Sequence, residues 1–378
     1  MKKFNLYIHI PFCQRICIYC DFYVSTARKL QGEFTDALLG EIALYKQKFP
    51  DAQPETVYFG GGTPSILSEE YLTKINEGIR SSFDVISEAE ITLECNPNDL
   101  TPVKLKTFRD MGVNRLSIGV QSFQDDELKF LTRNHTSGQA KEGIQNARNE
   151  SFTNISLDLI FGLPGQSPDN WKQNIDAALA FEPEHISVYN LTIEERTYLH
   201  KMVHQRKIEM PDENIELDMF LTAIEKLTRA GYEHYEISNY AKPGLRSKHN
   251  GSYWMGNHYL GLGPSAHSFD GERRWWNVRD IKKYCDVLRN DNKWPVDVAE
   301  ELSVQQKCIE YLFLNLRKRE GLDIRPFEKL GGFNFYEKFN NSIEKAGEFI
   351  ICDVEWVKLS NKGLFLYNKI CEEFVSAL

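Results

Sequence analysis

Three cysteines crowd into a short segment near the start of the chain and carry the clearest chemistry in the sequence. Cys13, Cys17 and Cys20 follow a run of strand-forming residues, so we expect them on a loop at the end of the first strand. Thiolates are the usual protein ligands of iron–sulfur clusters. Because a four-iron cluster takes four ligands and this loop offers three, the segment predicts a [4Fe–4S] cluster. Its open iron would suit a small molecule that chelates through an amine and a carboxylate.

Two other interpretations of these cysteines are weaker. A structural zinc site usually takes two pairs of ligands, and no second pair lies nearby, while His9 falls on the strand and is expected to face the sheet. Buried core thiols would follow a helical or strand spacing rather than lie on a turn. The other five cysteines are scattered and are expected to be buried apolar thiols. They are Cys95, Cys285, Cys308, Cys352 and Cys371.

The length and charge of the chain limit the functions it can have. Its 378 residues predict one large domain with a smaller one. The formal net charge of -9 argues against a general nucleic-acid binder, because phosphate contacts need surplus lysine and arginine. Neither a secretory signal nor an apolar run of membrane-spanning length is visible, so we expect a cytoplasmic protein without a transmembrane segment.

The first two-thirds of the chain alternates β-rich runs with stretches of helical period. This pattern predicts a parallel sheet with right-handed crossovers. The expected strands are Asn5–Ile10, Thr56–Phe59, Ala89–Glu94, Arg115–Val120, Asn154–Ile160 and His185–Leu191. The expected helices are Gly32–Lys48, Ser68–Phe83, Thr101–Met111, Gly138–Asn149 and Pro168–Ala180. Six such strands form an open sheet or a curved partial barrel, and periodicity alone does not separate the two.

The pattern changes after a further helix over Ile215–Ala230. A stretch rich in aromatics, glycine and histidine follows. Beyond it, we expect helices over Ser303–Arg319, Pro326–Leu330 and Tyr336–Ala346, and short strands over Phe349–Ile351, Trp356–Leu359 and Leu364–Leu366, with a turn at Asn361–Gly363. The sequence therefore predicts a barrel over residues 1–230, a connecting region over 231–300 and a small winged-helix-like α+β domain over 301–378.

Polar and glycine-rich motifs fall where the predicted strands end. Gly60–Gly62 follow the second strand directly, Glu94 ends the third, and Asp158 lies near the end of the fifth. Each has an ordinary interpretation by itself: a tight connection for the glycines, a helix cap for either carboxylate and a solvated charge for Arg133. In a βα barrel, however, the site is built on the carboxyl face of the strands. The joint placement of these motifs predicts a ligand site there.

The CxxxCxxC spacing, with an aromatic before the third cysteine, resembles the radical S-adenosylmethionine superfamily. Within it, the chain is similar to the oxygen-independent coproporphyrinogen oxidase-like family, which contains both coproporphyrinogen dehydrogenases and heme chaperones. The motifs that carry the likeness are Tyr7, Gly60–Pro64, Glu94–Pro97, Gly119–Phe123, Asp158–Pro164, His249–Trp254 and Gly263–Ser268. The resemblance implies a partial (β/α)6 barrel, a [4Fe–4S] cluster on the three cysteines and S-adenosylmethionine at the open iron.

The resemblance also implies which residues contact S-adenosylmethionine. The glycine loop would meet the methionine amino group with Thr63 beside it. Gln121, Arg133 and Asp158 match positions that hold the cofactor in the dehydrogenase, where a second molecule also binds. The whole implied set is Tyr7, Tyr19, Gly61, Gly62, Thr63, Glu94, Gln121, Arg133, Asp158, Thr192 and His267.

The segment from His249 to Trp254 carries a second candidate site. Physical reasoning alone favours a hydrogen-bonded turn at His249 and Asn250 with Trp254 in the core. The same motif is typical of the heme-chaperone branch, and imidazole can ligate heme iron. The resemblance therefore implies that His249, Asn250, Tyr253 and Trp254 take part in heme binding.

Two functions from different classes follow from the resemblance, and it leaves open whether the chain is an enzyme. The first is binding of heme and its delivery to acceptor proteins, such as respiratory cytochromes or bacterioferritin-like proteins. The second is radical decarboxylation of coproporphyrinogen propionates. Three features favour the first: Phe22 stands where the dehydrogenase has a further cysteine, only twelve residues precede Cys13, and the His249–Trp254 motif is present.

A third function, DNA-binding regulation, is suggested by the winged-helix-like tail alone. Residues 301–378 carry 11 lysines and arginines against 12 aspartates and glutamates, a net charge of 11 − 12 = −1. A DNA-reading module would normally be basic. The tail is therefore expected to cap the open face of the barrel or to contact another protein.

Overall fold

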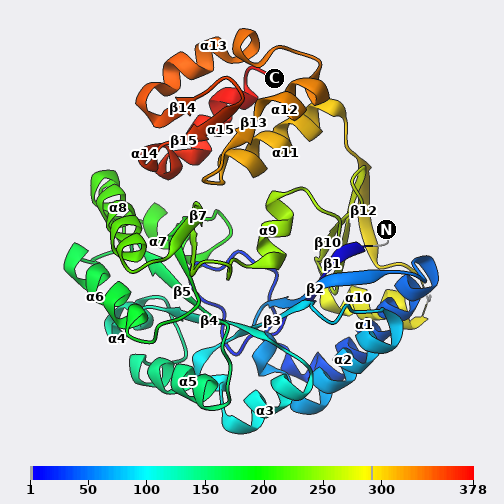
Figure 1. Cartoon of the computed structure of the whole chain (residues 1–378). Coiled ribbons are helices and arrows are strands. Elements are labelled where there is room, and N and C mark those ends of the chain that lie inside the picture. The colour runs from blue at the N-terminus through cyan, green and yellow to red at the C-terminus, as the bar shows by residue number, and fades with distance from the viewer. Residues whose placement is uncertain (1–2, 291–292) are drawn as a thin grey trace.

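Six parallel strands with helices between them form the main body of the chain, which a computed structural model describes over residues 3–290 and 293–378 (Figure 1). The strands pair in chain order. They are β1 (Lys3–Ile10), β2 (Gln53–Gly61), β3 (Glu90–Cys95), β4 (Arg115–Gln121), β5 (Ile155–Phe161) and β6 (His185–Asn190). The helices are α1 (Gln31–Lys48), α2 (Glu69–Ser82), α3 (Pro102–Asp110), α4 (Asp125–Phe130), α5 (Ser137–Asn149) and α6 (Pro168–Leu179). The expected partial (β/α)6 barrel is confirmed.

Serine and threonine side chains start four of these helices. Ser68, Thr101, Thr136 and Ser167 each accept a hydrogen bond from the backbone N–H three residues further on. Each cap satisfies a donor that the first turn of a helix leaves free. The caps fix where the loop after each strand must finish, and so they hold the carboxyl ends of the strands in place.

The inner face of the barrel is lined by polar side chains. Tyr58, Thr92 and Arg115 are register neighbours across β2, β3 and β4, and Glu94 and Ser117 are the next pair on that face. Arg115 is 1% exposed, and its Nε and Nη1 atoms find no hydrogen-bond partner among the described residues. The inner face of the barrel therefore carries polar and ionisable side chains rather than a purely apolar core.

Residues 231–301 extend both edges of the same sheet. On one edge, β8 (Asn239–Ala241) pairs antiparallel with β6, and β7 (Glu233–Glu236) follows it. On the other edge, β9 (Tyr259–Leu262) runs parallel to β1, followed by β10 (His267–Phe269), β11 (Arg273–Asn277) and β12 (Val296–Glu301). The predicted connecting region thus supplies strands of the main sheet, and its boundaries as a separate unit stay a prediction.

Four helices lie in or beside this part of the chain. They are α7 (Tyr198–His204), α8 (Glu213–Arg229), α9 (Lys248–Trp254) and α10 (Ile281–Asn290). Helix α9, which carries the histidine motif, contacts β2 and α11 (Val304–Leu316). Figure 1 shows it in the gap that the six parallel strands leave open, between β7 and β10. It fills the open side of the incomplete barrel.

The C-terminal residues form a small domain above the open side of the barrel (Figure 1). Its strands are β13 (Leu322–Asp323), β14 (Ile350–Cys352) and β15 (Trp356–Leu359), paired antiparallel in the order β13-β15-β14. Its other helices are α12 (Ile324–Gly331), α13 (Phe335–Ala346), α14 (Asn361–Phe365) and α15 (Tyr367–Val375). Single-turn 3-10 helices lie at Arg28–Leu30, Pro64–Ile66, Pro97–Asp99 and Gly347–Phe349. The small α+β domain is as expected.

One prediction for this domain is wrong. Leu364–Leu366 form no strand, and Asn361–Gly363 is no turn, because helix α14 begins there. Ser360 caps the helix by accepting a hydrogen bond from the N–H of Gly363 at 3.1 Å. A Cβ atom on Gly363 would lie 2.0 Å from the carbonyl oxygen of Phe349. The helix can therefore pack this closely against Phe349 only because position 363 is a glycine.

Four of the five scattered cysteines are buried, as expected, but Cys352 on β14 is exposed. Cys352 is exposed because it ends a strand at the edge of the small sheet. Across the described residues, no helix is long and apolar enough to span a membrane.

Candidate cofactor and ligand site

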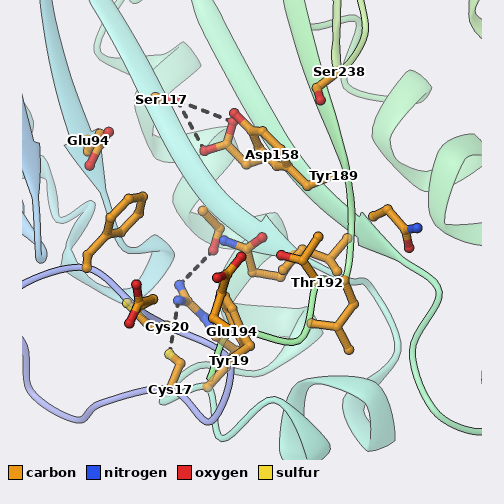
Figure 2. A pocket seen from close by; sticks show the side chains of 18 of the residues that line it. Cys17, Tyr19, Cys20, Glu94, Ser117, Asp158, Tyr189, Thr192, Glu194 and Ser238 are labelled. Carbon is orange, nitrogen blue, oxygen red and sulfur yellow. Dashed lines mark hydrogen bonds between the residues drawn. The ribbon is translucent and has the colours of Figure 1, made fainter. Parts of the chain in front are cut away.

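A cavity of about 850 Å³ lies between the cysteine loop, the carboxyl ends of the barrel strands and the C-terminal domain. Figure 2 shows side chains of the cysteine loop and of the strand ends around it, among them Cys17, Cys20, Glu94 and Asp158. The structure brings most of the predicted site residues together on its walls. These are Cys13, Cys17, Tyr19, Cys20, Gly61, Gly62, Thr63, Glu94, Gln121, Arg133, Asp158 and Thr192.

The cysteine loop is closed by backbone hydrogen bonds. The N–H of Cys13 donates to the carbonyl of Ser25 at 3.0 Å, and the N–H of Ser25 donates to the carbonyl of Pro11 at 2.6 Å. Within the loop, the N–H of Cys20 donates to the carbonyl of Cys17 at 3.2 Å. All three cysteines are free thiols, and the loop turns them toward the cavity.

The chemistry of this loop fits an iron–sulfur cluster. Burial raises the pKa of Cys13 and raises that of Cys20 to about 11, so iron binding would displace protons from these thiols. Nη1 of Arg133 donates to Sγ of Cys17 at 3.6 Å and supplies positive charge beside the thiolates. Within the described part of the chain, no three acidic, histidine or cysteine side chains are grouped around the position of a single metal ion. A four-iron cluster needs no such grouping, because each thiolate binds a different iron.

His9 faces the sheet, as the sequence predicts. Its Nδ1 lies 3.1 Å from the hydroxyl of Tyr7, and its Nε2 lies 2.9 Å from the carbonyl oxygen of Tyr23. Burial lowers its pKa to about 4. Both ring nitrogens are therefore engaged, and His9 does not supply a ligand to the cavity.

The glycine loop after β2 presses against the cysteine loop. Gly61 has a φ of +112°, a conformation that favours glycine. The N–H of Gly62 donates to the carbonyl of Ile10 at 2.8 Å, and a Cβ atom on Gly62 would lie 2.7 Å from the carbonyl oxygen of Phe12. Sγ of Cys13 lies 3.5 Å from the hydroxyl of Thr63. The glycines thus let the end of β2 pack directly against the backbone of the cysteine loop, next to Cys13.

We therefore expect Gly62→Ala to distort the cysteine loop. Its new Cβ would push Phe12 and Pro11, at a cost of about 1–3 kcal/mol for overpacking, and most of the reconstituted iron should be lost. Iron per chain after anaerobic reconstitution measures the effect. Gly40→Ala in helix α1, where nothing lies within 4 Å, is the matched control and should keep wild-type iron. Equal iron in both variants would contradict the contact.

Two buried carboxyl groups line the cavity. The carboxylate of Glu94 accepts hydrogen bonds from the hydroxyl of Tyr58 at 2.8 Å and the N–H of Gly61 at 3.2 Å. Ser117 donates to Asp158 at 3.2 Å. Burial is the main cause that raises the pKa of Glu94 to about 7 and that of Asp158 to about 6. Near neutral pH, each group can accept a hydrogen bond from a ribose hydroxyl or an ammonium.

Gln121 has an unusual backbone conformation and Arg133 has an unpaired buried donor, and both features are typical of ligand sites. Gln121 has a φ of 66°, next to a register shift between β4 and β5. A non-glycine residue in this conformation is uncommon and tends to occur at functional sites. Nη2 of Arg133 donates to Oδ1 of Asn96 at 2.6 Å and to the carbonyl of Gly119 at 2.8 Å, while its buried Nε has no partner among the described residues. A bound ligand could supply that acceptor.

The remaining predicted residues lie outside the walls of the cavity. Tyr7 lies on the inner face of β1, where its ring stacks on Tyr58 at 6.1 Å. His267 is exposed and stacks on Trp276 at 5.3 Å. The motif residues His249, Asn250, Tyr253 and Trp254 belong to helix α9 and also lie beyond the cavity walls.

His249 and Asn250 lie in helix α9 rather than in the turn that physical reasoning favours, and His249 is buried in a hydrogen-bonded network. Its Nδ1 lies 2.6 Å from the hydroxyl of Thr56 and its Nε2 lies 3.0 Å from the hydroxyl of Tyr253. Its ring stacks on Tyr58 at 4.8 Å. Burial lowers the pKa of His249 to about 3, so the ring is neutral. Both nitrogens are occupied in this conformation.

Sequence reasoning missed the upper wall of the cavity. Side chains from β6, α8, the C-terminal domain and the loop after β7 complete the site. They are Val188, Tyr189, Phe220, Ile237, Arg317, Leu364, Phe365 and Tyr367. The rule that barrel sites lie at the carboxyl ends of the strands identifies residues on the barrel itself. It cannot identify residues that the C-terminal domain places over the barrel.

A partial barrel with a three-cysteine loop at its carboxyl face is the architecture of one class of proteins. The family model for the Radical SAM superfamily matches residues 7–178. Among solved structures, coproporphyrinogen III oxidase (HemN) from Escherichia coli, a radical SAM enzyme, superposes with a TM-score of 0.85 at 24% identity, covering 100% of this chain and 91% of that one. This likeness shows that the two chains share a fold.

Curated relatives narrow the class to one family. The heme chaperone HemW of Bacillus subtilis is 36% identical over 99% of this chain and 100% of its own length. The heme chaperone HemW of Haemophilus influenzae is 37% identical over 100% and 99%. A mouse mitochondrial protein, radical S-adenosyl methionine domain-containing protein 1, is 36% identical over 97% and 86%. The chain therefore belongs to the HemW family of the radical SAM superfamily.

Proposed function

We propose that this protein is a heme chaperone that binds heme and transfers it to acceptor proteins. The observation that carries the proposal is the composition of the cavity. One part is lined by the three thiols of the cysteine loop and by buried polar groups, and another part is lined by apolar side chains from α8 and the C-terminal domain. The names of the relatives in Bacillus subtilis and Haemophilus influenzae support the same function.

In this proposal, Cys13, Cys17 and Cys20 hold a [4Fe–4S] cluster with S-adenosylmethionine at the open iron. Such a cluster supplies one-electron chemistry when it is bound. The residues of the chain bind and orient. Glu94 and Asp158 accept hydrogen bonds from polar groups of the nucleoside or the amino acid, and Arg133 offers its free Nε–H to a carboxylate. The glycine loop leaves room for the ligand to approach the backbone.

The apolar part of the cavity would receive the macrocycle. Phe161, Phe220, Leu364 and Phe365 line it, and such walls suit the faces of a porphyrin. We keep His249 as a proposed heme ligand. It lies beyond the cavity walls and Tyr253 holds its Nε2, so ligation would require the ring to give up that hydrogen bond and helix α9 to open toward the cavity.

We expect His249→Gln to weaken heme binding about tenfold or more, because glutamine can keep the hydrogen bonds to Thr56 and Tyr253 but is a poor iron ligand. Titration of hemin followed by its Soret absorbance measures the affinity. His204→Gln, on the exposed face of α7, is the matched control. A wild-type titration for His249→Gln would remove this residue from the proposal.

The alternative function is oxygen-independent coproporphyrinogen III dehydrogenation. It is favoured by the fold shared with the Escherichia coli enzyme and by Gln121, Arg133 and Asp158, which line the cavity. Against it, Phe22 stands where the dehydrogenase has a further cysteine, and Phe22 lines the same cavity while 73% exposed. Anaerobic incubation of reconstituted protein with S-adenosylmethionine, reductant and coproporphyrinogen III separates the two. Formation of protoporphyrinogen would overturn the chaperone proposal.

Transfer is tested separately from binding. Heme-loaded protein mixed with an apo-cytochrome should lose its Soret signal while the acceptor gains one at a matching rate. Retention of heme by the protein, with an acceptor that takes up free hemin under the same conditions, would contradict a chaperone and favour a storage or enzymatic role.

A further inference from the structure

We propose that Arg317 is the carboxylate anchor of the cavity and holds a propionate of the bound tetrapyrrole on the side formed by the C-terminal domain. The proposal deepens the proposed heme function and rests on it. Arg317 directly follows helix α11 and lines the same cavity as the cysteine loop.

Arg317 is held in one orientation by its neighbours. Its Nε and Nη2 donate to the same carboxylate oxygen of Glu236, at 2.9 and 2.6 Å. Glu236 is 0% exposed, and its other oxygen accepts hydrogen bonds from the N–H of Ser238 at 3.0 Å and from the side chain of Asn239. The backbone is fixed as well, because the N–H of Ile237 donates to the carbonyl of Arg317 at 3.1 Å.

The tryptophan of the histidine motif completes this support. The guanidinium carbon of Arg317 lies 3.7 Å from the centre of the Trp254 ring, a cation–π contact. The Arg317 side chain still exposes 21% of its surface, on the side that lines the cavity. Trp254 therefore acts as a positioning residue for Arg317.

The surroundings of Arg317 define the ligand it suits. The cavity walls carry three basic side chains, Arg15, Arg133 and Arg317. Arg133 is engaged by Cys17, Asn96 and Gly119, whereas Arg317 shares its wall with apolar side chains. They are Phe220, Ile237, Leu364 and Phe365. A rigid guanidinium beside apolar walls fits a flat, apolar ligand with a terminal carboxylate.

Glu236 balances the charge of Arg317, so binding of a ligand carboxylate by Arg317 depends on the placement of its N–H groups more than on net charge. Glu236 binds the Nε and Nη2 atoms of the Arg317 guanidinium. The N–H groups of Nη1 take no part in this ion pair. The ring centre of Tyr367, which also lines the cavity, lies 6.0 Å from the guanidinium carbon, and its hydroxyl interacts with Arg317 and donates to the carbonyl of Phe313 at 2.7 Å. A carboxylate that reaches Arg317 from the cavity would therefore meet the Tyr367 hydroxyl beside a guanidinium that Glu236 and Trp254 hold still.

The test compares the affinities of hemin and hemin dimethyl ester, which differ only at the propionates. The wild-type protein should bind the diacid about tenfold or more tightly than the diester, the factor for one charge-assisted hydrogen bond. Removing Arg317 alone would leave Glu236 buried and unpaired and could unfold the chain. We therefore use Arg317→Lys, which keeps a cation, and the double variant Arg317→Gln/Glu236→Gln, which removes both charges. The ratio should fall in the first and approach one in the second.

Arg325→Gln is the matched control, because Arg325 has the same charge in the same domain but lies outside the cavity, 3.3 Å from Glu355. Its ratio should equal that of the wild type. Equal affinities of the wild type for diacid and diester would overturn the anchor while leaving heme binding intact. A wild-type ratio in the folded double variant would do the same. Failure of the wild type to bind either compound would instead sink the proposed function, and this inference with it.

Discussion

Replacing Cys13, Cys17 or Cys20 with serine is expected to leave the reconstituted protein without its four-iron cluster. Each thiol lines the cavity. Cys95 lines it as well, but it is buried at the end of β3 and its thiol donates to the carbonyl of Leu93 at 3.5 Å, so we do not expect it to replace a loop cysteine. His9 is tied to Tyr7 and Tyr23 through both ring nitrogens. Iron and acid-labile sulfide per chain, with the visible absorption of the cluster, measure the loss after anaerobic reconstitution.

Cys352→Ser provides the matched control for these variants. Cys352 is exposed on β14, outside the cavity, so its replacement should leave iron and sulfide unchanged. A full complement of iron and sulfide in any of the three loop variants would refute the assignment of the cluster to this loop.

Trp171→Ala is expected to destabilise the chain by about 3–5 kcal/mol, the range for truncating a large buried aromatic. Trp171 is 0% exposed in helix α6, packs against Phe161 on β5 at 5.5 Å, and donates from Nε1 to the carbonyl of Met219 at 2.8 Å. Since Phe220 follows Met219 and lines the cavity, the loss should also loosen that wall. Urea unfolding followed by circular dichroism measures the change.

Trp171→Phe separates packing from hydrogen bonding at the same position. It keeps an aromatic ring but loses the donor to Met219, so we expect a smaller loss of about 1–2 kcal/mol. Exposed Trp294→Ala is the surface control. An unfolding midpoint for Trp171→Ala close to that of the surface control would contradict the role of Trp171 in holding α6 against β5 and α8.

The barrel and the lower half of the site could be predicted from the sequence because both follow local rules. Alternating strand and helix patterns gave β1 to β6, and the rule that barrel sites lie at strand carboxyl ends brought Glu94, Gly62 and Asp158 onto one face. The short helices α4, α7, α9, α10 and α15 were missed, because each spans only a few turns and so offers few repeats of the helical period.

The upper half of the site could not be predicted, because it depends on contacts between distant segments. Arg317 is oriented toward the cavity by Glu236, which lies 81 residues away in the sequence. Trp254 contacts Arg317 from a third segment. The strand predicted at Leu364–Leu366 failed for a related reason. An apolar triplet fits either a strand or a buried helix, and only the cap at Ser360 and the close packing of Gly363 decide between them.

The network around His249 fixes the tautomer of its ring. Asn5 donates from Nδ2 to the carbonyl of His258 at 3.2 Å, which turns its amide oxygen toward Thr56. The hydroxyl of Thr56 donates to that oxygen at 2.8 Å, so it must accept from His249, and the proton of the neutral imidazole sits on Nδ1. Nε2 then holds the lone pair and accepts from Tyr253. The protein thus keeps the imidazole in the protonation form that a histidine needs to bind a metal through Nε2, and a single phenol O–H occupies that atom.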